Sequence, residues 1–168
     1  VILADEQFAG RGQSGNVWQS EAGKNLTFSI IYQTSFLLAT EQFYLNMAVS
    51  LGIWSMVNSK LSIEKNKELT IHDSRFTTKI KWPNDIYNKK HKKVGGILLH
   101  TFDNECIVGI GINLQKNPQS IENSASLDLE ADSFEVSYKL HQYIFSHRMN
   151  PSEILEKFKN KSKENFPN

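Results

Sequence analysis

Two apolar runs near the middle of the chain decide the fold: VGGILLHTF over residues 94–102 and CIVGIGINL over residues 106–114. Both are rich in β-branched residues, and the turn-forming residues DNE at 103–105 separate them. This pattern predicts two antiparallel strands joined as a hairpin. We expect the rest of the sheet to lie on either side of this hairpin.

The second run alternates with a period of two. Within residues 108–113, Val108, Ile110 and Ile112 fall on one face, which we expect to pack in the core, whereas the other face carries Gly109, Gly111 and Asn113. Each glycine costs a strand about 0.5–1 kcal/mol. The bare face therefore favours a flat ligand lying across the sheet, with Asn113 at its polar end. A plain strand weakened by two glycines is the alternative.

The flanking segments predict the remaining elements. Strands are expected over residues 1–6, 26–32 and 76–82, a long helix over 37–57, a surface loop over 59–75, and two further helices that begin after Asp132 and Asn150. Strands followed by helices, without strict βαβ alternation, indicate an α+β domain with a mostly antiparallel sheet.

Composition excludes several classes of protein. The 168 residues contain 19 Lys+Arg and 18 Asp+Glu, a net charge of +1, so charge alone cannot hold a nucleic acid or an anionic membrane. Cys106 is the single cysteine, which excludes a disulfide within the chain and a cysteine-based zinc site. Without an apolar run of roughly 20 residues, we expect a soluble cytoplasmic protein. The chain opens on an apolar run without Met, and we expect it to be part of a longer protein.

A glycine-rich loop over residues 10–15, GRGQSG, matches the G-x-G-x-x-G pattern. A dinucleotide-binding loop would open a helix at once, and residues 16–20, NVWQS, do not start an amphipathic helix. A surface turn is one alternative. The other is a ligand-binding loop in which Arg11, between two glycines, clamps a phosphate or carboxylate.

The segment KWPNDIY at 81–87 places an amide, Asn84, beside a carboxylate, Asp85, at the rim of the sheet. Such a pair suits a nucleotide and Mg²⁺. An Asx turn with Trp82 anchored in the core is the structural alternative.

The basic run KKHKK at 89–93 is typical of a solvated hairpin tip or a nucleic-acid patch. Lys93 differs from its neighbours because it adjoins Gly95 and Gly96, where a ligand can lie against the backbone under its ammonium. By contrast, Cys106 is expected to be a small buried hydrophobe. The histidines lack metal-binding spacing, so zinc catalysis is not expected.

Together, four segments resemble the biotin protein ligase family in sequence, order and spacing: EQFAGRG at 6–12 with Trp18, KWPND at 81–85, KVGGIL at 93–98, and GIGIN at 109–113. The resemblance implies a core like that of class II aminoacyl-tRNA synthetases. It implies activation of biotin by ATP and Mg²⁺ to biotinyl-5′-AMP, then transfer to a lysine of a biotin carboxyl carrier protein. Residues 1–168 would form the catalytic domain, truncated at both ends, without a DNA-binding domain or a C-terminal β-barrel domain.

The resemblance also implies roles for individual residues. Arg11, Lys93 and Asp85 are the catalytic candidates, with Asp85 orienting or deprotonating the acceptor lysine. Biotin would be bound by Gln7, Gly10, Arg11, Gly12, Lys93, Gly96 and Gly109. The nucleotide would be bound by Arg11, Gln13, Trp18, Asn84, Lys93 and Asn113. Asp85 and Asn113 are the candidates for Mg²⁺.

The chain departs from the family's pattern at Ser14, where many relatives carry a basic residue, and it lacks the upstream Ser/Thr-rich element that binds the ureido ring. Two other functions stay open: a lipoate or octanoate ligase or transferase of the same fold, and a non-catalytic protein that binds biotin or its adenylate. Some relatives dimerise through sheet edges, so a homodimer is an open expectation. Neither nucleic acid nor membrane is an expected partner.

Overall fold

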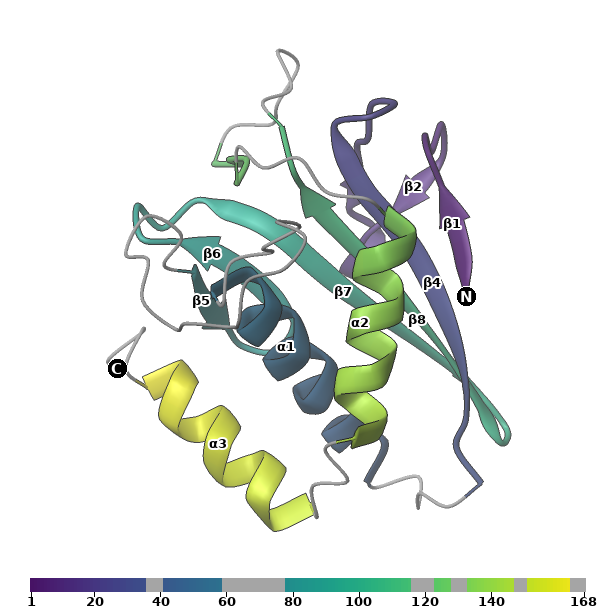
Figure 1. Ribbon diagram of the computed structural model, residues 1–168, viewed down its shortest axis with the longest axis vertical. Helices are drawn as coiled ribbons and strands as arrows, with labels where there is room; N and C mark the ends of the chain where they lie inside the picture. Colours follow the sequence, from purple (N-terminus) through teal and green to yellow (C-terminus); the bar gives the residue numbers. More distant parts are fainter. Residues whose placement is uncertain (36–40, 59–77, 116–122, 128–132, 147–150, 164–168) are drawn as a thin grey trace.

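The computed structural model describes residues 1–35, 41–58, 78–115, 123–127, 133–146 and 151–163. Its main element is an antiparallel sheet of six strands, with helices on one face (Figure 1). In order across the sheet the strands are β1 (Ile2–Ala4), β4 (Asn25–Gln33), β8 (Glu105–Asn113), β7 (Lys93–Phe102), β6 (Asp85–Asn88) and β5 (Thr78–Lys81). This architecture confirms the predicted α+β class and the mostly antiparallel sheet.

Strands β7 and β8 form the predicted hairpin, in register from Gly95 opposite Ile112 to Phe102 opposite Glu105. The alternation predicted for β8 is present: Val108, Ile110 and Ile112 are buried on the side of the helices. The glycines therefore lie on the other face of the sheet.

Within the described residues, three helices supply the second layer: α1 (Gln42–Asn58), α2 (Ser133–Ser146) and α3 (Pro151–Lys163). α3 begins at the predicted proline. The first residues of the predicted helix over 37–57, the loop over 59–75 and the cap Asp132 lie outside the described residues. Buried side chains of α1 pack against the inner face of the sheet, where Cys106 is a buried hydrophobe as predicted. None of the described helices is long and apolar enough to span a membrane.

Two features of the segment after residue 76 were not indicated by its sequence. The turn at Pro83 and Asn84 reverses the chain within the sheet, and residues 85–88 form β6. Trp82 is not a core anchor: 55% of its surface is exposed, and its ring contacts Phe43 and Phe158 at the edge of the helical layer. Of the predicted strand over 76–82, β5 comprises Thr78–Lys81, and residues 76 and 77 are not described.

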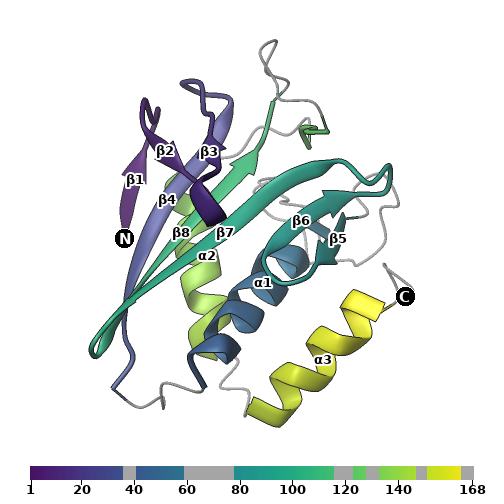
Figure 2. The same cartoon turned by 180° about the vertical axis from the view of Figure 1, so that it is seen from behind.

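The predicted glycine-rich loop contains secondary structure that its sequence did not indicate. β2 (Gly10–Arg11) pairs with β3 (Val17–Trp18), and a short 3-10 helix, η1 (Gln13–Gly15), lies between them. This hairpin lies over the face of the sheet that the helices leave open (Figure 2).

Candidate active site

The β2–β3 hairpin and the open face of the sheet enclose a cavity of about 440 Å³. The sequence motifs predict twelve ligand-binding residues, and all of them except Asn113 line this cavity. The lining residues among them are Gln7, Gly10, Arg11, Gly12, Gln13, Trp18, Asn84, Asp85, Lys93, Gly96 and Gly109.

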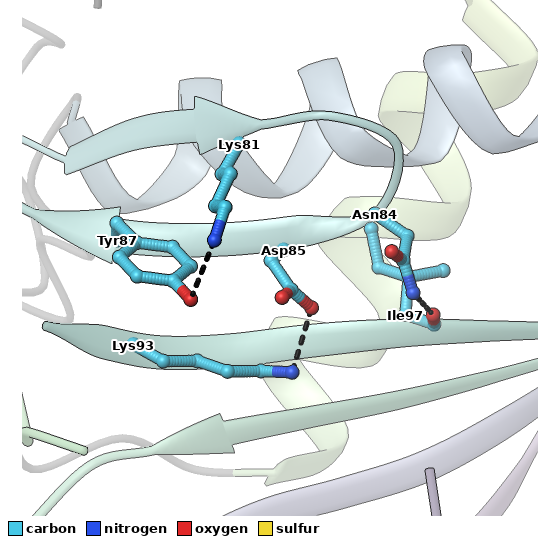
Figure 3. Close-up of polar contacts among 6 residues, drawn as sticks. All are labelled: Lys81, Asn84, Asp85, Tyr87, Lys93 and Ile97. Carbon is cyan, nitrogen blue, oxygen red and sulfur yellow. Dashed lines mark hydrogen bonds and ion pairs between the residues drawn. The ribbon is translucent and has the colours of Figure 1, made fainter. Parts of the chain in front are cut away.

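The charged centre of the cavity is an ion pair between Lys93 and Asp85. The Lys93 Nζ lies 2.6 Å from Asp85 Oδ1, and both side chains are partly buried (Figure 3). The Lys93 chain runs over Gly96, where an added Cβ would lie 3.2 Å from the Nζ atom. Because Gly96 has no side chain, the Lys93 ammonium can lie over it and reach Asp85 on the neighbouring strand β6. Lys92, the neighbour of Lys93 in the basic run, is exposed and does not line the cavity.

The other side of the cavity is set by Trp18 of β3. Its indole lies on Gly111, because a Cβ at that position would come within 2.5 Å of Trp18 Cε2. Part of the bare strip on β8 is therefore covered by this ring. Trp18 Nε1 is buried without a hydrogen-bond partner, so a polar donor is held at the cavity with nothing to satisfy it.

In the first strand of the hairpin, β2, the backbone at Gly10 lies close to Gln7 and Trp18. A Cβ at Gly10 would lie 3.1 Å from Gln7 Oε1 and 3.2 Å from Trp18 Cβ. Gly10 therefore lets Gln7, Arg11 and Trp18 face one cavity from a hairpin of two residue pairs. Arg11 is exposed at its rim, as suits a guanidinium that meets an anionic ligand.

The side-chain amides of Asn84 and Asn113 are both used in hydrogen bonds within the protein. Asn84 is buried, its side-chain Nδ2 donates to the Ile97 carbonyl at 2.5 Å, and its backbone carbonyl accepts from the Ile97 N–H at 3.0 Å. Asn113 Oδ1 accepts from Asn25 Nδ2 at 2.8 Å, and its Nδ2 donates to the Ala125 carbonyl at 3.1 Å. Asn84 thus ties the turn after β5 to β7, and Asn113 ties β8 to β4 and the segment at 125.

Sequence analysis missed the apolar half of the cavity. Leu98, His100 and Phe102 of β7 line it together with Ile107 of β8. The His100 and Phe102 rings stack with centroids 4.5 Å apart. The period-two pattern could have found these residues, because those on β7 share a face with Gly96 and Ile107 shares one with Gly109.

Comparison with known proteins agrees with this arrangement. The family model described as "Biotin/lipoate A/B protein ligase family" matches residues 1–117. The chain belongs to this family. A curated member, the "Biotin--[acetyl-CoA-carboxylase] ligase" of Mycobacterium tuberculosis, is 25% identical over 131 residues, which are 77% of this chain and 45% of that protein. The chain thus spans less than half the length of that relative.

Solved structures of biotin protein ligases share the fold. The structure of the Leishmania major enzyme with biotinyl-5-AMP has a TM-score of 0.79 at 21% identity, covering 99% of this chain and 72% of that one. The structure from Aquifex aeolicus with biotin and ATP has a TM-score of 0.60 at 30% identity, covering 96% of this chain and 62% of that one. The six-stranded sheet with helices on one face is therefore the biotin protein ligase fold.

The resemblance to biotin protein ligases implies a Mg²⁺ ion, and the donor atoms that line the cavity decide which residues could hold it. Within the described part of the chain, no group of three or more His, Cys, Asp or Glu side chains is placed to hold a metal. Asp85 supplies a carboxylate, whereas both polar atoms of the Asn113 amide are hydrogen-bonded, Oδ1 to Asn25 and Nδ2 to Ala125. Mg²⁺ often takes one or two carboxylates and completes its shell with water and substrate phosphates. Asp85 fits that pattern, and Asn113 does not.

Proposed function

We propose that this chain is the catalytic part of a biotin–protein ligase, which activates biotin with Mg-ATP and transfers it to a lysine of a carboxylase carrier domain. The observation that carries the proposal is the Lys93–Asp85 pair over Gly96, set between a hairpin bearing Arg11 and an apolar cavity end. Family membership and the biotin ligands named for the similar structures support it.

The cavity has one end for each part of an acyl-adenylate. Leu98, Ile107 and Gly109 form an apolar surface with room above Gly109, where an added Cβ would make only ordinary contacts of 3.6 Å or more. This end suits the ring system and alkyl chain of biotin. Trp18, on Gly111, offers an aromatic face to the adenine base. The Lys93 ammonium lies over Gly96, which is paired in register with Gly111, and there the carboxyl and the α-phosphate would meet.

In the first step, an oxygen of the biotin carboxylate forms a bond to the α-phosphorus of ATP. The bond from that phosphorus to the oxygen bridging to the β-phosphate breaks, and pyrophosphate leaves with the electron pair. Negative charge accumulates on phosphate oxygens. The Lys93 ammonium and the Arg11 guanidinium stabilise that charge without covalent chemistry.

In the second step, the amine of the acceptor lysine attacks the acyl carbon, and AMP leaves with the electrons of the anhydride bond. The amine gives up a proton in this step. The Asp85 carboxylate lines the cavity and can accept this proton once the Lys93 ammonium has turned from Asp85 to the phosphate. A magnesium ion held by Asp85 would supply charge neutralisation at the phosphates.

Lys93→Ala tests the proposal. Biotin, Mg-ATP and an apo carrier domain are incubated with enzyme, and the carrier is weighed by mass spectrometry. We expect a gain of one biotinyl group with the wild type and a loss of about 10²–10³-fold in the rate of adenylate formation with Lys93→Ala. Lys92→Ala is the matched control and is expected to retain the wild-type rate of adenylate formation.

No mass gain with the wild type would overturn the proposal. Preferential attachment of lipoate or octanoate would reassign the chain to the other branch of its family. Biotin binding without release of pyrophosphate would make it a binding protein. A wild-type rate in Lys93→Ala would remove Lys93 from the catalytic group.

A further inference from the structure

The basic run at residues 89–93, KKHKK, carries four residues that the proposed reaction does not use. Residues 89–92 form the tip of the hairpin between β6 and β7, and all four are exposed. The Asn88 side chain orders this tip, because its Oδ1 accepts from the backbone N–H groups of Lys90 and Lys92, both at 3.0 Å. The Asn88 N–H in turn donates to the Lys92 carbonyl at 2.9 Å. The tip therefore holds its lysines on an ordered turn.

The lysines of this tip differ from others in the chain in their electrostatic surroundings. Lysines elsewhere lie against a carboxylate: Lys24 against Glu21, Lys93 against Asp85 and Lys139 against Glu135. Within the described part of the chain, Lys90 and Lys92 form no such ion pair, and neither does Lys79 on the adjoining strand β5. Like charges that are held close together repel one another, so the tip favours an anionic partner.

The tip lies on the side from which an acceptor lysine can reach the charged centre. A continuous row of paired residues crosses β5, β6, β7 and β8: Lys81, Asp85, Gly96 and Gly111. Trp18 covers the Gly111 end of this row. Toward the other end, the side chains of Lys93 and Asp85 are still 36% and 22% exposed. A protein that brings a lysine to this pair therefore lies over the part of the open face formed by β5, β6 and the start of β7.

The tip is close enough to the charged centre for one protein partner to contact both. Lys90 follows Asp85 by five residues, so their backbones lie at most about 18 Å apart. A domain of about 100 residues has a radius of gyration of about 13 Å. A carrier domain of this size that presents its lysine to Asp85 can therefore cover the tip as well.

We infer that Lys90 and Lys92, with Lys79 beside them, dock an acidic surface of the carrier domain that supplies the acceptor lysine. This inference rests on the proposed function, since it assigns the chemistry of the protein substrate. Charges at the rim of an interface act mainly on the encounter of the two proteins, so the tip serves the second step and not the formation of the adenylate. A nucleic acid is the other polyanion that a basic run can bind, and the net charge of +1 disfavours it.

The test compares the double variant Lys90→Glu/Lys92→Glu with the wild type in transfer from preformed biotinyl-5′-AMP. One acceptor is an apo biotin carboxyl carrier domain, and a second is the same domain with the carboxylates nearest its acceptor lysine changed to amides. Hydroxylamine, a small nucleophile that needs no docking surface, is the third. Lys157→Glu/Lys159→Glu is the matched control, because it makes the same charge change at two exposed lysines of α3, in the helical layer (Figure 1).

We expect Lys90→Glu/Lys92→Glu to raise the KM for the carrier by about tenfold at low ionic strength, with kcat unchanged at saturating carrier. The difference should vanish at about 1 M salt, where the Debye length falls to about 3 Å. The amidated carrier should have a raised KM with the wild type and no further rise with the variant. The rates with hydroxylamine and of pyrophosphate exchange into ATP should stay at the wild-type values. Unchanged circular dichroism and melting temperature establish that the variants fold.

An unchanged KM for the carrier in Lys90→Glu/Lys92→Glu would overturn the inference while leaving the proposed function intact. An equal rise in Lys157→Glu/Lys159→Glu would overturn it as well, because the effect would then come from total charge. Binding of a labelled oligonucleotide that the double variant loses, with an unchanged KM for the carrier, would reassign the tip to nucleic acid. Absence of biotin transfer to the carrier by the wild type itself would instead refute the proposed function.

Discussion

At the scale of single residues, asparagines hold the site in shape. The Asn84 amide joins the turn that carries Asp85 to β7, and the Asn46 Nδ2 on α1 donates to the Pro83 carbonyl of the same turn at 3.2 Å. Asn25 and Asn113 bond to each other across β4 and β8. The buried amides of Asn84 and Asn46 donate hydrogen bonds to backbone carbonyls near the ends of the strands. These bonds fix the backbone of the turn and so the position of the charged groups next to it.

Asn113→Ala separates this structural role from nucleotide binding. The substitution leaves the buried Asn25 Nδ2 and the Ala125 carbonyl without their partner, and we expect the free energy of unfolding to fall by about 1–3 kcal/mol. Urea titration followed by circular dichroism measures this loss. At temperatures where the variant is folded, the KM for ATP should change less than about twofold. A KM raised tenfold or more without a loss of stability would restore Asn113 to the nucleotide site.

At the scale of elements, the β2–β3 hairpin is the small part that closes the cavity. It consists of two residue pairs, the Gly12 N–H bond to the Asn16 carbonyl at 2.7 Å, and a turn in which Ser14 has a φ of 54°. The positive φ restrains this non-glycine residue to a conformation that few side chains favour. The contact of Trp18 with Gly111 is one that joins the hairpin to the sheet.

Ligand binding should change the environment of the Trp18 indole. Its Nε1 is buried without a partner, and an adenine base at this end of the cavity has to share or displace the contact with Gly111. We expect a change in tryptophan emission on adding biotinyl-5′-AMP, and its loss in Trp18→Phe. Trp54 and Trp82, which do not line the cavity, remain in that variant as internal controls. An equal change in Trp18→Phe would show that the signal arises elsewhere.

At the scale of the whole molecule, the sheet separates two environments. The face toward the helices is an apolar core, and the open face carries the charged groups and the bare glycines. The near-zero net charge of the sequence conceals this separation, because Arg11, Lys81 and Lys93 gather on the open face while acids elsewhere balance them. An anion is attracted locally, although the protein has no strong overall field.

The core titrates in the alkaline range. Burial raises the pKa of Tyr32 well above its ordinary value, with Cys106 adding to the rise, and burial likewise raises the pKa of the Cys106 thiol. The unfolded chain therefore loses these protons at a lower pH than the folded protein. Their contribution to stability is complete below the unfolded values and falls as the pH rises through about 8.5 for cysteine and about 10 for tyrosine.

We expect the melting temperature to decline above about pH 8.5, and Cys106→Val to delay the first part of this decline. Thermal denaturation of both proteins across the alkaline range measures the effect. A steeper decline in Cys106→Val than in the wild type would contradict the assignment. Val is the matched replacement because it is apolar and of similar size, so the core stays filled.

Much of the fold follows from local patterns. The β7–β8 hairpin was predictable because alternation and turn residues act over a few positions, and α3 because Asn150 and Pro151 mark a helix start. β6 was not predictable, since Pro83 normally ends a strand and the pairing that makes residues 85–88 a strand comes from β5 and β7. The β2–β3 hairpin was missed because two-residue strands leave no periodic signal.

The candidate site, like the fold, was predictable only in part from the sequence. Its motifs identified Arg11, Asp85, Lys93, Gly96 and Gly109 as residues that line one cavity. They did not indicate that Trp18 covers Gly111, that Asn84 and Asn113 bond within the sheet, or that Lys81 reaches Tyr87. Residue types and spacing carry chemistry, whereas hydrogen-bond partners depend on which strands become neighbours.

The sequence by itself determined the class of fold, the bare face of β8 and the order of the motifs, because each depends on residues close together in the chain. Only the tertiary structure decided that Trp18 meets Gly111, 93 positions away, and that the row from Lys81 to Gly111 is continuous. The physical reason is that strand register and the packing of the hairpin on the sheet are set by contacts between distant segments. Those contacts turn four separate motifs into a single charged site with an apolar end.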